Sequence, residues 1–325
     1  MRMAKVLNGN LDALKVLLAI FVVVLHCHFM GGNYTAVGYL LCNGLFRVAV
    51  PTFFVINGYY LWQTLASGHS FALWFKRGLQ LYLLWMLVYS PIYASFADLG
   101  SVGGVLGILK QFVIGYFHLW YLVGMLGGGL ILYLLRNRPT GLLLVLASSA
   151  FVVGLVLQYA RVYFELPNAF LQHFNQNDYT ARNFLFMGFP FMALGFLLAR
   201  HGVPERATRG KVCLALALGL ALLLGEAWLN YSHQADARQN FDFLASLPLV
   251  TSALFLLPFV FFRASSSNLN AKLSSALYYV HPLFLYGALS AGLAYGNTLT
   301  AVVLLLALVA APLLILVSRR VRFLL

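Results

Sequence analysis

The chain has 325 residues, of which 62% are hydrophobic and only 9% are charged, and its formal net charge is +13. Soluble domains carry about a quarter charged residues, so this composition excludes an ordinary soluble enzyme and predicts an all-α, polytopic membrane protein. The basic residues are spread between apolar blocks and form no basic stripe, so we expect contacts with membrane lipids and no nucleic-acid partner.

Ten apolar segments are each long enough to cross a bilayer as a helix. They lie at about 12–30, 44–63, 79–96, 119–135, 141–158, 183–199, 212–230, 243–262, 275–294 and 299–317. Ten crossings would place both termini on one side, and that side then holds 16 of the 21 Lys and Arg residues. This asymmetry predicts cytoplasmic termini. No linker or repeat interrupts the pattern, so we expect one membrane domain over residues 1–325.

The first segment carries the charged and polar residues Asp12, Lys15, His26 and His28 in an otherwise apolar run. Lys15 and His26 are eleven positions apart, which puts them about 20° apart around a helix and roughly 16 Å apart along it. His28 points about 160° away from His26, and Asp12 is placed for an i,i+3 pair with Lys15. Ionisable groups at this depth indicate an active site or conduction path. The alternative is a topology-setting lysine and a histidine bonded to a neighbouring helix.

Four further stretches carry candidate site residues. The run at 46–62 places Arg47 and Pro51 near the outer end of the second segment, with Asn57 and Tyr59 inside it, although a kinked packing helix would look the same. Lys76 and Arg77 precede the third segment and suit cofactor phosphates, but ordinary positive-inside charge is the alternative. The remaining candidates are His118 and Trp120 at the start of the fourth segment, and Tyr278 and His281 in the ninth.

Two long connections separate these segments. The stretch 97–118 is Gly-rich and half apolar, and it suits a re-entrant or interfacial segment. The stretch 159–182 mixes aromatic residues with Arg161, Glu165, His173 and Asp178, which suits a sugar-like ligand or an interfacial belt equally well.

Taken in order, these motifs resemble the acyltransferase-3 family of integral membrane O-acyltransferases. The matching features are Lys15 and His26 preceded by Asp12, the run VPTFFVINGYY, the HLWYL cluster and YYVHP. Two positions depart from the family pattern. Asn57 replaces a common serine. The cytoplasmic basic pair, often Arg-x-x-Arg in the family, reads Arg77-Gly-Leu-Gln80 here, with Lys76 added before it.

The resemblance implies a bacterial inner-membrane enzyme. It would transfer an acyl group, most commonly acetyl, from cytosolic acetyl-CoA to a hydroxyl of a cell-surface glycan or its lipid-linked saccharide precursor, without a metal. His26 would act as general base or acyl carrier. The implied site residues are His26, Lys15 and Asp12 for catalysis; Lys76, Arg77, Tyr278 and His281 for the cofactor; and Arg47, Asn57, Tyr59, His118 and Trp120 for the substrate.

The alternative function is a secondary transporter or exporter of a small polar metabolite. Such proteins also use about ten helices with ionisable residues near the midplane, and they commonly show paired halves. No second copy of the Lys-x10-His helix occurs in the chain, which favours the enzyme.

Overall fold

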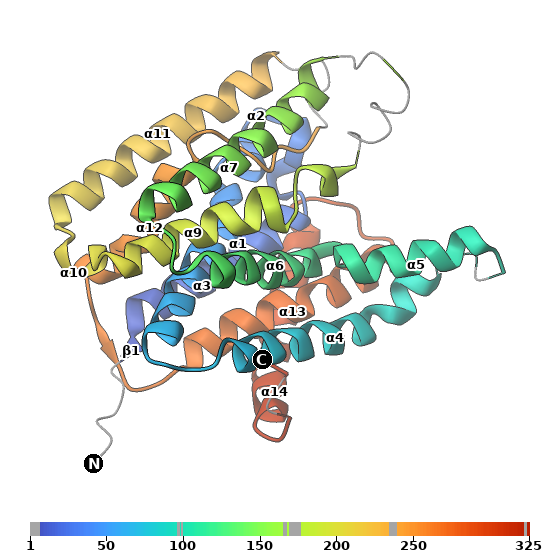
Figure 1. The fold of residues 1–325 in the computed structure, drawn as a ribbon. Helices are drawn as coiled ribbons and strands as arrows, with labels where there is room; N and C mark the ends of the chain where they lie inside the picture. The colour runs from blue at the N-terminus through green and yellow to red at the C-terminus, as the bar shows by residue number, and fades with distance from the viewer. Residues whose placement is uncertain are drawn as a thin grey trace. The chain divides into compact units, whose positions relative to one another are not determined.

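The computed structural model describes residues 7–95, 98, 100–164, 168, 177–233, 239–321 and 324–325. The described chain is almost entirely helical (Figure 1). Its contacts divide it into two compact units. The first unit comprises Met1–Ile56, Leu198–Phe323 and Leu325, and the second comprises Asn57–Leu197 and Leu324.

The elements of the first unit are β1 (Leu7–Asn8), α1 (Gly9–His26), α2 (Ala36–Cys42), α10 (Val203–Arg206), α11 (Arg209–His233), α12 (Leu247–Val260), β2 (Ala264–Ser265), α13 (Leu269–Ser290) and α14 (Asn297–Ser318), with 3₁₀ segments at Phe29–Tyr34 and Leu45–Val48. The second unit contains α4 (Phe71–Ser95), α5 (Val102–Ile114), α6 (Trp120–Leu135), α7 (Thr140–Tyr163), 3₁₀ turns at Phe117–Leu119 and Asp178–Thr180, and a π-helical turn at Phe184–Gly188. Two helices, α3 (Ala49–Ala66) and α9 (Phe189–Arg200), run through the boundaries between the units.

Each of the ten predicted segments coincides with one of these helices. Six stretches in the described part of the chain are long and apolar enough to cross a membrane: Gly9–His26, Ala36–Ala66, Phe117–Leu135, Thr140–Tyr163, Arg209–His233 and Asn297–Ser318. The total of ten crossings and the side of the termini stay predictions.

Several predicted boundaries were wrong, and three of them concern candidate residues. The third segment was placed at 79–96, but α4 begins at Phe71, so Lys76 and Arg77 lie in its first two turns and do not precede it. The second segment was placed at 44–63, but α3 begins only at Ala49, because Leu45–Val48 forms a 3₁₀ turn. Arg47 therefore precedes the helix. Pro51 falls in its first turn, where a missing N–H costs nothing, so it does not kink the interior. The first helix ends at His26, and not near residue 30, because His28 has a left-handed backbone with φ of 53°.

Within the stretch 97–118, Val102–Ile114 form the helix α5, which is capped by Ser101 and has no buried residue. Its predicted interfacial position is untested. In the stretch 159–182, Arg161 donates to Asp178 at 2.8 Å, while Glu165 and His173 lie outside the described residues.

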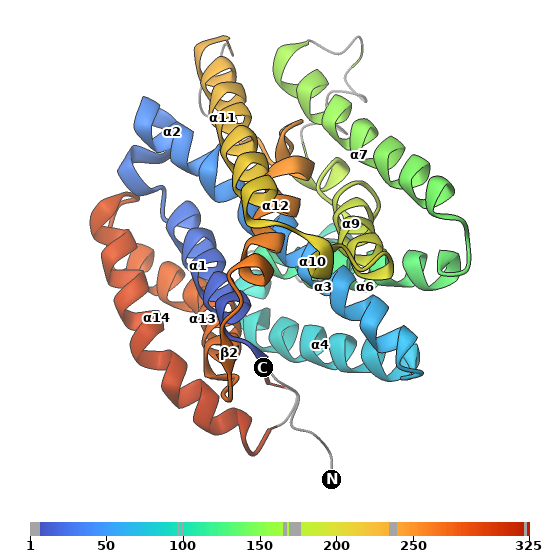
Figure 2. The same ribbon diagram turned by 90° about the vertical axis from the view of Figure 1, so that its left-hand side faces the viewer.

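In the first unit, α14, α13 and α1 lie side by side (Figure 2). The start of α1 is fixed by its own cap, because the Asn8 side chain accepts from the Leu11 N–H at 3.1 Å and donates to the Pro258 carbonyl at 3.0 Å. Gly9 N–H also donates to the Arg263 carbonyl at 2.8 Å. The N-terminus of α1 is therefore tied to the segment that ends α12 and leads through β2 into α13.

Helices α1 and α13 run in the same direction. Ser274, early in α13, donates its hydroxyl to the carbonyl of Lys15, and His281, two turns later, contacts His26 near the end of α1. The two-residue strands that precede the helices, β1 and β2, pair antiparallel and tie the two helix starts together. This direction is the one that a ten-crossing arrangement requires of its first and ninth helices.

In the second unit, small residues let backbones approach closely. A Cβ added to Gly58 on α3 would lie 1.9 Å from the Met192 carbonyl oxygen of α9. A Cβ on Gly188, in the π turn, would lie 2.4 Å from the carbonyl oxygen of Gly124 on α6. Helices packed in a membrane commonly use small residues in this way.

Candidate functional site

The predicted pair at the start of α1 is confirmed. Lys15 Nζ lies 2.8 Å from Asp12 Oδ1, and the two side chains are 17% and 8% exposed. The pair sits within an apolar helix, where a carboxylate neighbour lets the ammonium keep its charge at lower cost. Because α1 is continuous from Gly9 to His26, the predicted alignment of Lys15 and His26 along one helix face holds.

The central feature of the first unit is a pair of histidines on α1 and α13. His26 Nδ1 lies 2.9 Å from His281 Nε2, and the two rings are nearly parallel, with an interplanar angle of 15°. His281 is fully buried, whereas His26 is partly exposed. The family resemblance implied that His281 binds the cofactor. The structure places it against the predicted catalytic histidine.

The tautomer of His281 follows from its second nitrogen. His281 Nδ1 lies 2.8 Å from the Tyr278 carbonyl oxygen and 3.1 Å from that of Leu277, and a carbonyl only accepts, so Nδ1 carries the proton. The Tyr278 carbonyl is available because its helical partner would be the N–H of residue 282, and Pro282 has none. Neutral His281 therefore presents a lone pair at Nε2.

This assignment fixes His26 in turn. Since His281 Nε2 accepts, His26 Nδ1 must donate, which places the lone pair of neutral His26 on its Nε2 atom. The chain of bonds from Tyr278 to His281 to His26 resembles the outer-shell bonds that hold functional histidines in one tautomer and ring orientation. Tyr278 contributes its backbone carbonyl to this arrangement, and its side chain is buried.

The end of α1 that carries His26 is also held by backbone bonds. Gly296 N–H donates to the Cys27 carbonyl at 2.9 Å, and Met30 N–H donates to Asn297 Oδ1 at 2.8 Å. Both partners lie at the start of α14. His28 turns away from the helix and stacks on Tyr295, with ring centroids 4.5 Å apart. The helical-wheel angle predicted for His28 was wrong, because the helix has already ended.

Arg47 lies in a second polar network of the first unit. Its guanidinium donates to the carboxylate of Asp242 and, at 2.9 Å, to Asn43 Oδ1. Asn43 in turn donates to Asn33 at 2.7 Å, and Asn33 donates to Asn240 at 3.1 Å. Arg47, Asn43 and Asp242 are buried. These bonds join the turn after α1, the turn before α3 and the segment before α12. The prediction that Arg47 binds substrate is untested.

The other predicted substrate residues belong to the second unit. Asn57 Nδ2 donates to the Tyr121 hydroxyl at 2.5 Å, in the first turn of α6. Trp120 is the first residue of that turn and His118 lies just before it, and both are buried. The structure therefore brings Asn57 to the HLWYL cluster. Tyr59 is buried, with its ring against that of Tyr60.

The predicted cofactor residues Lys76 and Arg77 also belong to the second unit. Both side chains are exposed, near the start of α4. Their position leaves them accessible to an anion, and their role is untested.

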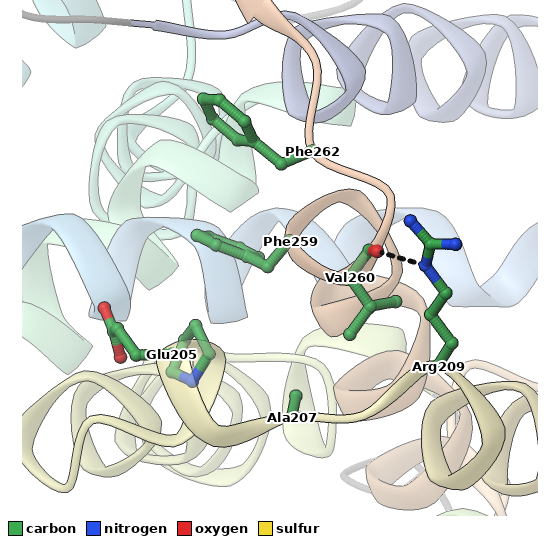
Figure 3. A pocket seen from close by; sticks show the side chains of 7 residues that line it. Glu205, Ala207, Arg209, Phe259, Val260 and Phe262 are labelled. Atoms are coloured by element: carbon green, nitrogen blue, oxygen red, sulfur yellow. Dashed lines mark hydrogen bonds between the residues drawn. The ribbon is translucent and has the colours of Figure 1, made fainter.

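A cavity of about 450 Å³ lies in the first unit beside α10 and the end of α12, lined by Pro204, Glu205, Ala207, Arg209, Phe259, Val260 and Phe262. Arg209 Nε donates to the Val260 carbonyl at 3.0 Å, which anchors the side chain at one side of the cavity (Figure 3). No predicted site residue lines it.

Sequence reasoning missed three kinds of residue. Asp242 is the ion-pair partner of Arg47, and the rule that membrane-buried arginines pair with acids could have prompted a search among the eight acidic residues. Glu226 accepts from the N–H groups of Ala245 and Ser246 at 2.7 and 3.1 Å, where α12 begins. Ser274 had no sequence signal.

Comparison with known proteins places the chain in a family. The profile described as an acyltransferase domain matches residues 8–318. A serine/alanine racemase of Enterococcus gallinarum is 28% identical over 297 residues, covering 86% of this chain and 41% of the racemase. An amino-acid racemase of Enterococcus faecalis is 25% identical over 291 residues, covering 85% and 40%. The chain thus spans about two fifths of the length of these relatives. No solved structure matches the chain. From the profile match over nearly its whole length, the chain belongs to the acyltransferase-3 family, and it is a helical membrane protein.

Proposed function

We propose that this chain is a multi-pass inner-membrane O-acyltransferase. It moves an acyl group, acetyl in the simplest case, from cytosolic acyl-CoA to a hydroxyl of a cell-surface glycan or its lipid-linked precursor. The proposal includes ten crossings with both termini in the cytoplasm. His26 is the general base or the transient acyl carrier.

The observation that carries the proposal is the bonded pair of His26 and His281. A general base at neutral pH needs a lone pair at a fixed position, and an imidazole held by a second group supplies one. His281 is anchored to a backbone carbonyl and holds His26 Nδ1–H, so the basic nitrogen of His26 is Nε2. The same nitrogen would be the nucleophile if an acyl-histidine forms.

In the direct route, His26 Nε2 takes the proton of the acceptor hydroxyl while that oxygen attacks the thioester carbonyl. The new C–O bond forms, the C–S bond breaks, and the thiolate leaves with the proton returned from His26. Lys15, paired with Asp12 on the same helix, orients the donor, and Lys76 and Arg77 contact its phosphates. Asn57, Tyr59, His118 and Trp120 contact the acceptor, as does Arg47 in this proposal.

The test uses the purified full chain reconstituted in lipid vesicles with acetyl-CoA and candidate glycan acceptors. Release of free coenzyme A and mass spectrometry of the acceptor report the reaction. We expect His26→Ala to abolish acceptor-dependent release, while His28→Ala, a matched histidine two positions later, retains it. Full activity of His26→Ala would overturn the assignment.

Two other results would overturn the function itself. Flux of a polar metabolite without consumption of acetyl-CoA would identify a transporter. The two relatives are named as racemases, so interconversion of L- and D-serine or alanine by this chain, without acyl transfer, would also refute the proposal.

A further inference from the structure

The first unit has a second cavity, of about 480 Å³, lined by residues of α11, α12 and the stretch between α9 and α11. Its floor is made of apolar and small side chains, among them Val212, Ala215, Leu249, Ala253 and Leu256. Its remaining lining includes the basic residues His201, Arg206 and Lys211. We call this cavity the α11–α12 groove.

The groove opens beside a surface suited to hydrocarbon. On α11, Leu214, Leu218 and Leu222 follow one another at i,i+4 spacing and are 61%, 53% and 57% exposed. Leu249 on α12 is 40% exposed and lines the groove itself. Because α11 is long and apolar enough to cross a membrane, this leucine row would face lipid tails.

The basic residues lie at one end of that helix. Arg206 belongs to α10, Lys211 belongs to the first turn of α11, and both are exposed. The local charge around them favours anions, because the stretch 200–211 contains three Arg and one Lys against the single acid Glu205. Basic residues at the membrane surface, next to a groove between helices, attract anionic lipid headgroups.

We propose that the α11–α12 groove binds an anionic glycerophospholipid. One acyl chain lies along the apolar floor, and the phosphate is held by Arg206 and Lys211. A soluble anion would leave the apolar floor uncovered. A zwitterionic lipid would fill the floor but would bring no net charge to the two cations. The proposal is independent of the acyl-transfer reaction, since no candidate catalytic residue lines the groove.

The test measures lipid that copurifies with the full chain after equilibration with equal amounts of phosphatidylglycerol and phosphatidylcholine in mild detergent. We expect the wild-type chain to retain phosphatidylglycerol preferentially. The double variant Arg206→Gln with Lys211→Gln removes two surface cations and should reduce the preference roughly tenfold. Arg319→Gln with Arg320→Gln, which removes two exposed cations after α14, should leave the preference intact.

A second pair of variants tests the groove itself. Ala215→Phe places a ring in the groove and should lower retention of both lipids, whereas Ala217→Phe, on the exposed side of the same helix, should not. Each variant is first shown to be monodisperse by size exclusion. His26→Ala should bind lipid like the wild type, which separates this proposal from the proposed function.

Three results would overturn the proposal. The first is equal retention of the two lipids by the wild-type chain. The second is an unchanged preference in the double variant of Arg206 and Lys211. The third is displacement of phosphatidylglycerol by inorganic phosphate or coenzyme A, which would assign the cations to a soluble phosphate ligand.

Discussion

Replacing His281 with phenylalanine tests the histidine pair most directly. Phenylalanine keeps a flat ring in the fully buried position but removes the Nε2 acceptor 2.9 Å from His26 Nδ1. Leaving a donor unsatisfied in a protein interior costs about 1–3 kcal/mol. The same bond favours the tautomer and ring orientation that His26 needs. At about 1.36 kcal/mol for each factor of ten in rate, losing that free energy corresponds to a roughly 5- to 160-fold fall in kcat.

The assay is steady-state release of coenzyme A by the reconstituted chain, with acetyl-CoA and acceptor varied in turn. A positioning role for His281 lowers kcat and leaves KM for acetyl-CoA nearly unchanged, whereas the cofactor-binding role predicted from sequence raises that KM. The neighbouring buried residue Tyr279 supplies the control, because Tyr279→Phe changes the same helix without touching His26. An unchanged kcat in His281→Phe would refute the tautomer argument.

Three further predictions concern the folded state. The first and third are measured by thermal unfolding in detergent, and the second by the yield of monodisperse protein. Asp242→Leu should lower the free energy of unfolding by about 3–5 kcal/mol because it leaves Arg47 buried without its carboxylate. Adding Arg47→Met should recover much of that loss, and a double variant as unstable as the single variant would contradict the ion-pair argument. Gly58→Ala should reduce the yield of folded protein sharply, whereas Gly107→Ala, which meets nothing within 4 Å, should behave as wild type. Glu226→Ala should lower the free energy of unfolding by about 0.5–2 kcal/mol, because it removes the acceptor for two N–H groups at the start of α12. An unchanged midpoint of thermal unfolding would show that water replaces the carboxylate.

The features that could be predicted from sequence are the local ones. The positions of the helices follow from runs of apolar residues, and the alignment of Lys15 with His26 follows from the constant rise and turn of one helix. The pair of Asp12 and Lys15 lies within one helical turn. In each case the relevant residues are close in sequence, so periodicity alone carries the information.

The features that sequence missed depend on packing between distant segments. His26 and His281 are 255 residues apart, and Arg47 and Asp242 are 195 apart, so neither pairing leaves a periodic signal. The end of α1 depends on the left-handed backbone at His28. The helical-wheel argument assumed that the helix continued, and it could not detect this break.

The His-Pro step in α13 has a consequence for how such sites arise. A proline in a membrane helix leaves one carbonyl without its usual donor, and the histidine just before it fills that vacancy with its own ring. Pro282 therefore frees a backbone carbonyl, and His281 donates a hydrogen bond to it. This bond fixes which ring nitrogen carries the proton without a negatively charged partner. In this chain, two neighbouring residues of α13 thus give an imidazole of fixed orientation that meets His26.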